Sequence, residues 1–84
     1  MINITNVKVI KTEGNFRVKG IASITIDDSF VVHDIKILES ERGLYVAMPS
    51  RRTPDGAFKD ITHPINAETR ELIQKAIINE YEKN

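Results

Sequence analysis

The sequence predicts an α+β fold, in which an antiparallel β-meander of about five strands over residues 2–62 carries a C-terminal α-helix over residues 67–82, in a dimeric protein. Runs of β-branched residues alternate with short turn sequences, and short connections join antiparallel neighbours. A convincing helical spacing of apolar residues begins only after residue 66. The 84 residues form one domain, 1–84, of a size at which a lone core supplies only a few kcal/mol, so a partner subunit is expected to add stability.

Residues 2–11 form the first expected strand because β-branched residues dominate it. The apolar alternation changes parity after Ile4, and this change predicts a β-bulge near Asn6. A two-residue hairpin turn at 13–14 would set Lys8 opposite Lys19.

The same turn would set Val9 opposite Val18 in the second strand, residues 16–26, where Gly20 marks an expected bend. One face of this strand is expected to be buried. That face carries Phe16, Val18, Ala22, Ile24 and Ile26.

Three further strands are expected at residues 30–38, 44–48 and 58–62. The first of them has apolar residues of both parities near its start, which is typical of a strand covered on both faces. The C-terminal helix is expected on one face and a second subunit on the other. Pro49 ends the second of these strands because it has no N–H to continue a ladder.

The helix is expected to begin after Asn66, a good N-cap residue, with acidic side chains near its positive end. Its apolar stripe would dock on the sheet, and each large side chain that is fully buried contributes about 1.5–3 kcal/mol. Arg70, Gln74 and Lys75 fall outside that stripe. The stripe consists of Leu72, Ile73, Ala76, Ile77 and Tyr81.

The most informative stretch is the loop at residues 48–56, in which Arg51 and Arg52 lie between two turn signals, Met48-Pro49 and Thr53-Pro54-Asp55-Gly56. Arginine offers a planar fork of donors suited to phosphate or carboxylate. The pattern therefore favours an anion-binding loop, although adjacent surface arginines are more often simply solvated.

Composition narrows the class of protein. Twelve basic residues balance twelve acidic ones, so overall charge gives no argument for nucleic acid, and cysteine is absent. No run approaches the roughly 18 apolar residues of a membrane span, and no signal-peptide pattern is evident at the N-terminus. A cytoplasmic protein is the expectation.

Catalytic and metal sites are not indicated by the sequence. His33 and Asp34 are adjacent in an expected strand and would point to opposite faces. His33 is expected to be buried and hydrogen-bonded. Neither His33 nor His63 belongs to a recognised metal-ligand spacing, and no glycine-rich phosphate loop occurs. No enzyme activity, cofactor, metal or small-molecule substrate is therefore predicted.

Four segments resemble the stage V sporulation protein G (SpoVG) family, and the resemblance covers nearly the whole chain. They are IASITID at 21–27, FVVHDI at 30–35, GLYVAMPSRRTPDG at 43–56 and DITHPIN at 60–66. The resemblance implies a bacterial regulator of sporulation, septation and gene expression, in which homodimers bind DNA and, in some members, RNA.

The resemblance implies that basic residues of the loop and helix bind nucleic acid, because they match basic residues of the family by position. Arg51 and Arg52 match the family's loop pair, Lys59 lies just beyond, and Arg70 matches the arginine after HPIN, with Lys75 further along the helix. A protein-interaction module of the septation or sporulation machinery, without specific nucleic-acid binding, is the alternative.

Overall fold

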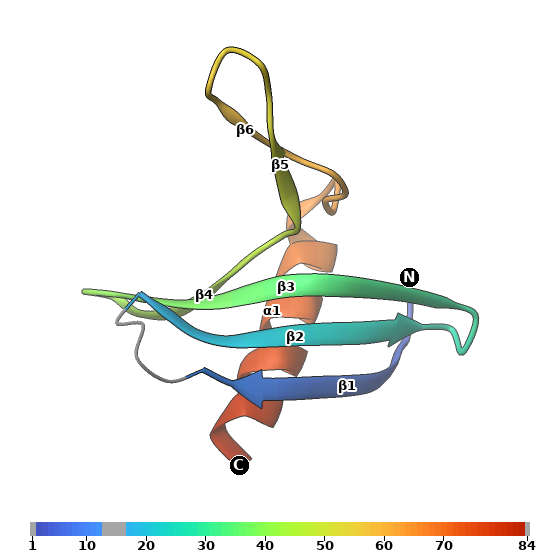
Figure 1. The fold of residues 1–84 in the computed structure, drawn as a ribbon. Coiled ribbons are helices and arrows are strands. Elements are labelled where there is room, and N and C mark those ends of the chain that lie inside the picture. Colours follow the sequence, from blue (N-terminus) through green and yellow to red (C-terminus); the bar gives the residue numbers. More distant parts are fainter. Residues whose placement is uncertain (1, 13–16, 84) are drawn as a thin grey trace.

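The structure is a computed structural model that describes residues 2–12 and 17–83. Over these residues the chain forms a four-stranded antiparallel sheet of order β1-β2-β3-β4, a separate two-stranded hairpin and one helix (Figure 1). The sheet strands are β1 (Ile4–Lys11), β2 (Val18–Ile26), β3 (Phe30–Ser40) and β4 (Gly43–Ala47). The hairpin strands are β5 (Ser50–Arg52) and β6 (Phe58–Asp60), and the helix is α1 (Ala67–Lys83).

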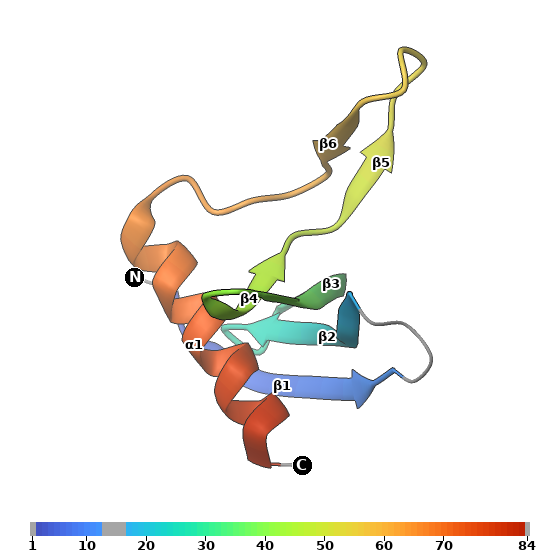
Figure 2. The same cartoon turned by 90° about the vertical axis from the view of Figure 1, so that its left-hand side faces the viewer.

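The predicted α+β class and C-terminal helix are confirmed, but the continuous five-strand meander is wrong. The fifth strand is shorter than residues 58–62, and it pairs with β5 instead of joining the sheet. Pro49 explains the break, because proline cannot donate to a ladder and the chain leaves the sheet after β4. Figures 1 and 2 show the resulting hairpin projecting away from the sheet.

The register of the first hairpin also differs from the prediction. Val9 lies opposite Ala22 and Lys8 opposite Ser23, so neither Val18 nor Lys19 is the cross-strand partner. The turn predicted at 13–14 lies outside the described residues, as does Phe16. The predicted bulge near Asn6 is confirmed by a shift in register between Ile4 and Asn6.

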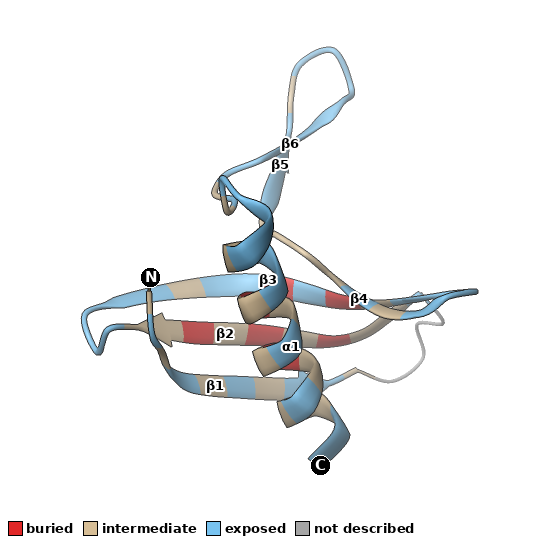
Figure 3. Cartoon of the chain, turned by 180° about the vertical axis from the view of Figure 1, so that it is seen from behind, coloured by how far each residue is buried: buried red, intermediate tan, exposed pale blue. Residues whose placement is uncertain are grey.

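The core lies between the sheet and α1 (Figure 3). Ile73 and Ile77 of the helix pack there against the sheet, which confirms that the predicted apolar stripe docks on it. The buried apolar side chains of the described residues are few for a chain of this length. They are Ala22, Ile24, Ile35, Ile37, Ile73 and Ile77.

The other face of the sheet, here called the open face, is covered by no element of the described chain (Figures 1 and 2). By strand alternation it carries apolar side chains as well as lysines. Helix α1 covers one face of β3 as predicted, and the cover of the other face by a second subunit stays a prediction. The apolar residues of the open face are Ile10, Ile21, Val31, Leu38 and Tyr45.

Tight turns join β2 to β3 and β3 to β4 where the sequence predicted them. Between β2 and β3, Asp27 and Asp28 adopt φ angles of 51° and 52°, and the Ser29 N–H donates to the Ile26 carbonyl at 2.9 Å. Between β3 and β4, Gly43 takes a φ of 116°, which a side chain would disfavour.

The helix of the described chain is too short and too polar to cross a bilayer.

Candidate functional site

The two arginines of the predicted loop lie in strand β5, where the structure separates them. Arg51 pairs with Lys59, and Arg52 pairs with Phe58. Residues that lie directly opposite each other on paired strands point to the same face, so Arg51 and Lys59 share one face of the hairpin. Arg52 shares the other face with Phe58 and Ser50. The site predicted as an Arg51–Arg52 pair is therefore better described as an Arg51–Lys59 pair.

The Arg51–Lys59 face is exposed and cationic. Within the described residues, neither side chain forms an ion pair with an acid; an ion pair elsewhere joins Lys19 Nζ to Glu39 Oε1 at 3.8 Å. Like charges directly opposite each other on neighbouring strands reduce stability. An anion that bridged the two side chains would remove that repulsion, so the arrangement is suited to phosphate or carboxylate.

The tip of the hairpin is held by hydrogen bonds around the predicted turn. The Gly56 N–H donates to the Thr53 carbonyl at 2.9 Å, and the Thr53 N–H donates to the Ala57 carbonyl at 2.8 Å. Asp55 accepts from the Thr53 hydroxyl and, at 3.3 Å, from the Ala57 N–H. The Thr53 hydrogen bond, followed by that from Ala57, lowers the pKa of Asp55 below its usual 3.8.

The helix residues named by the sequence fall into two groups. Arg70 and Gln74 are one helical turn apart, and they line a small cleft with Pro64, Met48 and Ile73. Lys75 is exposed, and it lies about 100° around the helix from Gln74. Helix α1 and the β5–β6 hairpin extend on different sides of the sheet (Figure 2). The predicted site residues are therefore divided between two parts of the molecule, because Arg70 and Lys75 belong to α1 and the other cations belong to the hairpin.

A cluster that sequence reasoning missed lies where β3 bulges opposite Ser23. Ala22 pairs with Ile35 and Ile24 pairs with Val32, so His33 and Asp34 together face one residue of β2. Asp34 takes a φ of 60°, a left-handed conformation that aspartate tolerates better than most residues.

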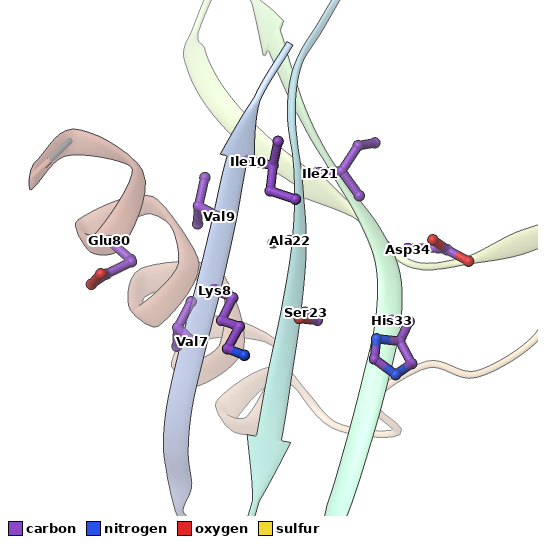
Figure 4. Close-up of a pocket in the computed structure, with 10 residues that line it drawn as sticks. All are labelled: Val7, Lys8, Val9, Ile10, Ile21, Ala22, Ser23, His33, Asp34 and Glu80. Atoms are coloured by element: carbon purple, nitrogen blue, oxygen red, sulfur yellow. The ribbon is translucent and has the colours of Figure 1, made fainter.

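The bulge overturns the prediction that His33 and Asp34 point to opposite faces of a regular strand. Both line one depression of about 550 Å³, together with Lys8 and Ser23 (Figure 4). His33 is exposed, so the predicted buried histidine is wrong as well. A polar aspartate inside an apolar strand was the available signal, since such a residue can break the alternation.

Neither histidine forms part of a metal cluster in the described chain. Across residues 2–12 and 17–83, no group of three or more His, Asp or Glu side chains is placed to hold a metal ion. The His63 Nδ1 atom lies 3.1 Å from the carbonyl of its neighbour Pro64. The arrangement with the clearest chemical capacity is therefore the cationic face of the hairpin.

Fold and site together define a small α+β protein with a projecting hairpin that presents paired cations. The chain belongs to the SpoVG family, whose model matches residues 2–83. It is 60% identical over 82 residues to the "Putative septation protein SpoVG" of Clostridium perfringens, with 98% of this chain and 91% of the relative covered.

Other relatives of the same name extend the comparison. The Clostridium kluyveri protein is 60% identical over 82 residues, covering 98% of this chain and 85% of the relative. The Caldanaerobacter subterraneus protein is 56% identical over 82 residues, covering 98% and 90%. The family predicted from the four sequence segments is thereby confirmed.

Proposed function

We propose that this chain is a nucleic-acid-binding regulatory protein of septation or sporulation that acts as a homodimer in the cytoplasm. The observation that carries the proposal is the direct cross-strand pairing of Arg51 with Lys59 on an exposed face without acidic partners in the described residues. The name that the relatives carry, a septation protein, supplies septation as the process. DNA is the first expected ligand, and RNA is the second.

Binding would be directed mainly at the phosphate backbone. A dimer presents the Arg51–Lys59 pair twice, so up to four hairpin cations can neutralise phosphates although the chain has a formal net charge of zero. Arg52 and the more distant Lys75 would add contacts at the edge of the bound strand. Arg70 and Gln74 lie one above the other on the helix, and their fork-like side chains are the candidates for reading base edges.

The direct test is the double variant Arg51→Ala/Lys59→Ala. It should weaken binding to all DNA sequences alike and reduce the slope of log affinity against log salt by about 1 for each phosphate that the two side chains neutralise in the wild-type complex. Fluorescence anisotropy at several salt concentrations measures both quantities. Folding should not suffer, because the substitutions remove a repulsive pair.

A matched control separates the hairpin from net charge. Arg42→Ala/Lys83→Ala removes the same charge from the β3–β4 turn and the end of α1. It should leave affinity close to wild type. An equal loss of affinity in both double variants, or unchanged binding in the hairpin variant, would contradict the proposed site.

The alternative, a module that grips acidic protein partners, is tested by competition. Under the nucleic-acid proposal, a specific oligonucleotide displaces labelled DNA better than an equal length of random DNA or a polyanion such as polyglutamate. Equal displacement by all three would favour the protein-interaction alternative, because the same cations would then recognise any dense negative charge.

A further inference from the structure

The pairing of the β5–β6 hairpin continues for one step beyond its two strands. At the base of the hairpin, the Ile61 N–H donates to the Pro49 carbonyl at 2.7 Å. Pro49 and Ile61 therefore lie opposite each other, as Arg51 and Lys59 do two residues nearer the tip. Because side chains two residues apart in a strand point to the same face, Ile61 extends the Arg51–Lys59 face toward the base of the hairpin.

Ile61 is an exposed aliphatic side chain on this otherwise cationic face. It is 65% exposed, although isoleucine is a residue type that folded proteins usually bury. Rows of side chains two residues apart along a strand are about 7 Å apart, so one bound nucleotide can contact both the cationic pair and Ile61. A nucleotide matches this combination, because it joins an anionic phosphate to a base with apolar faces.

The opposite face of the hairpin, here called the groove face, is less suited to the same ligand. Phe58 on this face is 71% exposed, and it lines a groove of about 680 Å³ together with Leu38 and Tyr45 of the open face. A second subunit that covered the open face, as the sequence predicts, would close this groove. The Arg51–Lys59 face would stay accessible in such a dimer, because it points away from the groove.

The lengths of the side chains distinguish an unpaired base from a duplex. Arg51 and Lys59 extend well beyond the Cδ1 atom at which the Ile61 side chain ends, so Ile61 is recessed behind the charges. In a duplex the phosphates lie outside and the bases are stacked in the interior, so a recessed side chain does not reach the face of a base. In a single strand the bases can be splayed out, and one can turn back onto an apolar surface.

From this geometry we infer that Ile61 is a base-contacting residue and that the proposed ligand is a single strand of DNA or RNA. Arg51 and Lys59 hold its phosphate, and an unpaired base lies against Ile61 and Pro49. The inference rests on the proposed function and names its class of ligand. The cations hold the backbone of any sequence, whereas the contact with a base face adds affinity only where bases are unpaired.

The test compares three probes of about 16 nucleotides by fluorescence anisotropy: single-stranded DNA, RNA of the same sequence and the corresponding duplex DNA. The wild-type chain should bind at least one single strand more tightly than the duplex. Ile61→Ala should weaken binding to that strand by about fivefold and leave duplex affinity within about twofold of wild type. The slope of log affinity against log salt should stay unchanged, because the substitution removes no charge.

Two further variants separate base contact from an effect on folding. Ile65→Ala is the matched control, because Ile65 is 89% exposed but lies beyond the paired residues of the hairpin, and it should bind all probes as the wild type does. Ile61→Phe enlarges the apolar surface at the same position. It should strengthen binding to the preferred single strand, a gain that a folding defect would not produce.

The possible failures are distinguishable. Equal affinity of the wild-type chain for the duplex and both single strands would overturn the choice of ligand. If Ile61→Ala bound every probe as the wild type does while Arg51→Ala/Lys59→Ala lost affinity for all of them, the base contact would be overturned and the proposed function would stand. A wild-type chain that bound none of the probes would overturn both.

Discussion

Asp55 at the tip of the hairpin shows how a single carboxylate can set the conformation of a turn. Its hydrogen bonds from the Thr53 hydroxyl and the Ala57 N–H favour the charged form and lower its pKa. A carboxyl group with a lowered folded-state pKa contributes stability above its unfolded pKa, and that contribution is lost as the pH falls through the folded value. The turn should therefore be insensitive to pH near neutrality and loosen only below about pH 4.

An NMR titration of the Asp55 carboxyl group and the Ala57 amide checks this prediction. Both signals should titrate together, below the usual value for aspartate. Thr53→Val removes the hydroxyl donor and should raise the pKa of Asp55. A pKa at or above the ordinary 3.8 in the wild-type chain would show that these hydrogen bonds do not act on the carboxylate.

The conformation of one aspartate also explains why strand alternation alone could not predict that His33 and Asp34 lie together. Asp27, Asp28 and Asp34 all have positive φ, yet only the first two follow a recognisable turn sequence. Asp34 sits within an otherwise extended apolar strand, so its left-handed conformation depends on the register of β2 against β3. Register is a tertiary property, and a period of two applied to β3 therefore misplaces His33 relative to Asp34.

Helix α1 begins with a cap whose energetic contribution can be measured. The Thr69 N–H donates to the Asn66 Oδ1 atom at 2.8 Å, satisfying one of the amides that the first turn leaves unpaired. Asn66→Ala should lower the free energy of unfolding by about 1 kcal/mol in urea titrations. Asn66→Asp keeps the acceptor and adds a charge that suits the helix dipole, so it should be at least as stable as wild type. Equal midpoints for the alanine and wild-type chains would contradict the capping role.

Elements differ in how far their own sequence determines them. The sequence predicts the helix to within one residue of its observed end, because its cap and its apolar stripe are local signals. It places the second strand of the β5–β6 hairpin in the main sheet, because nothing local to residues 58–62 says which strand they pair with. Three-residue strands carry little alternation, and only Pro49 indicates that the ladder stops.

The same limit applies to the candidate site. Arg51, Arg52 and Lys59 can be identified from the sequence, but which two of them share a face depends on strand phase. Loop geometry would keep Arg51 beside Arg52, whereas strand geometry places Lys59 beside Arg51. The sequence therefore predicts candidate residues, and the structure shows which of them share a face.

At the scale of the molecule, the limited core and the large exposed surface belong together. The described residues bury few side chains fully, all of them between the sheet and α1, and leave the open face and the hairpin uncovered. The homodimer of the proposed function would add to the stability that this small core supplies. Association that covers the groove face of the hairpin would also fix the direction in which Arg51 and Lys59 point, so the proposed dimer would orient the proposed binding site.

If two copies stabilise each other through this surface, thermal unfolding must depend on protein concentration, because dissociation accompanies unfolding. For two chains of 84 residues, a tenfold rise in concentration should raise the Tm by about 4 °C. Phe58→Ser should melt at a lower temperature that hardly changes with concentration, whereas Ile65→Ser should keep the wild-type slope. Scanning calorimetry over two decades of concentration measures this slope directly. A concentration-independent Tm in the wild-type chain would mean that a single chain is stable without a partner. The exposed apolar surface would then need another explanation.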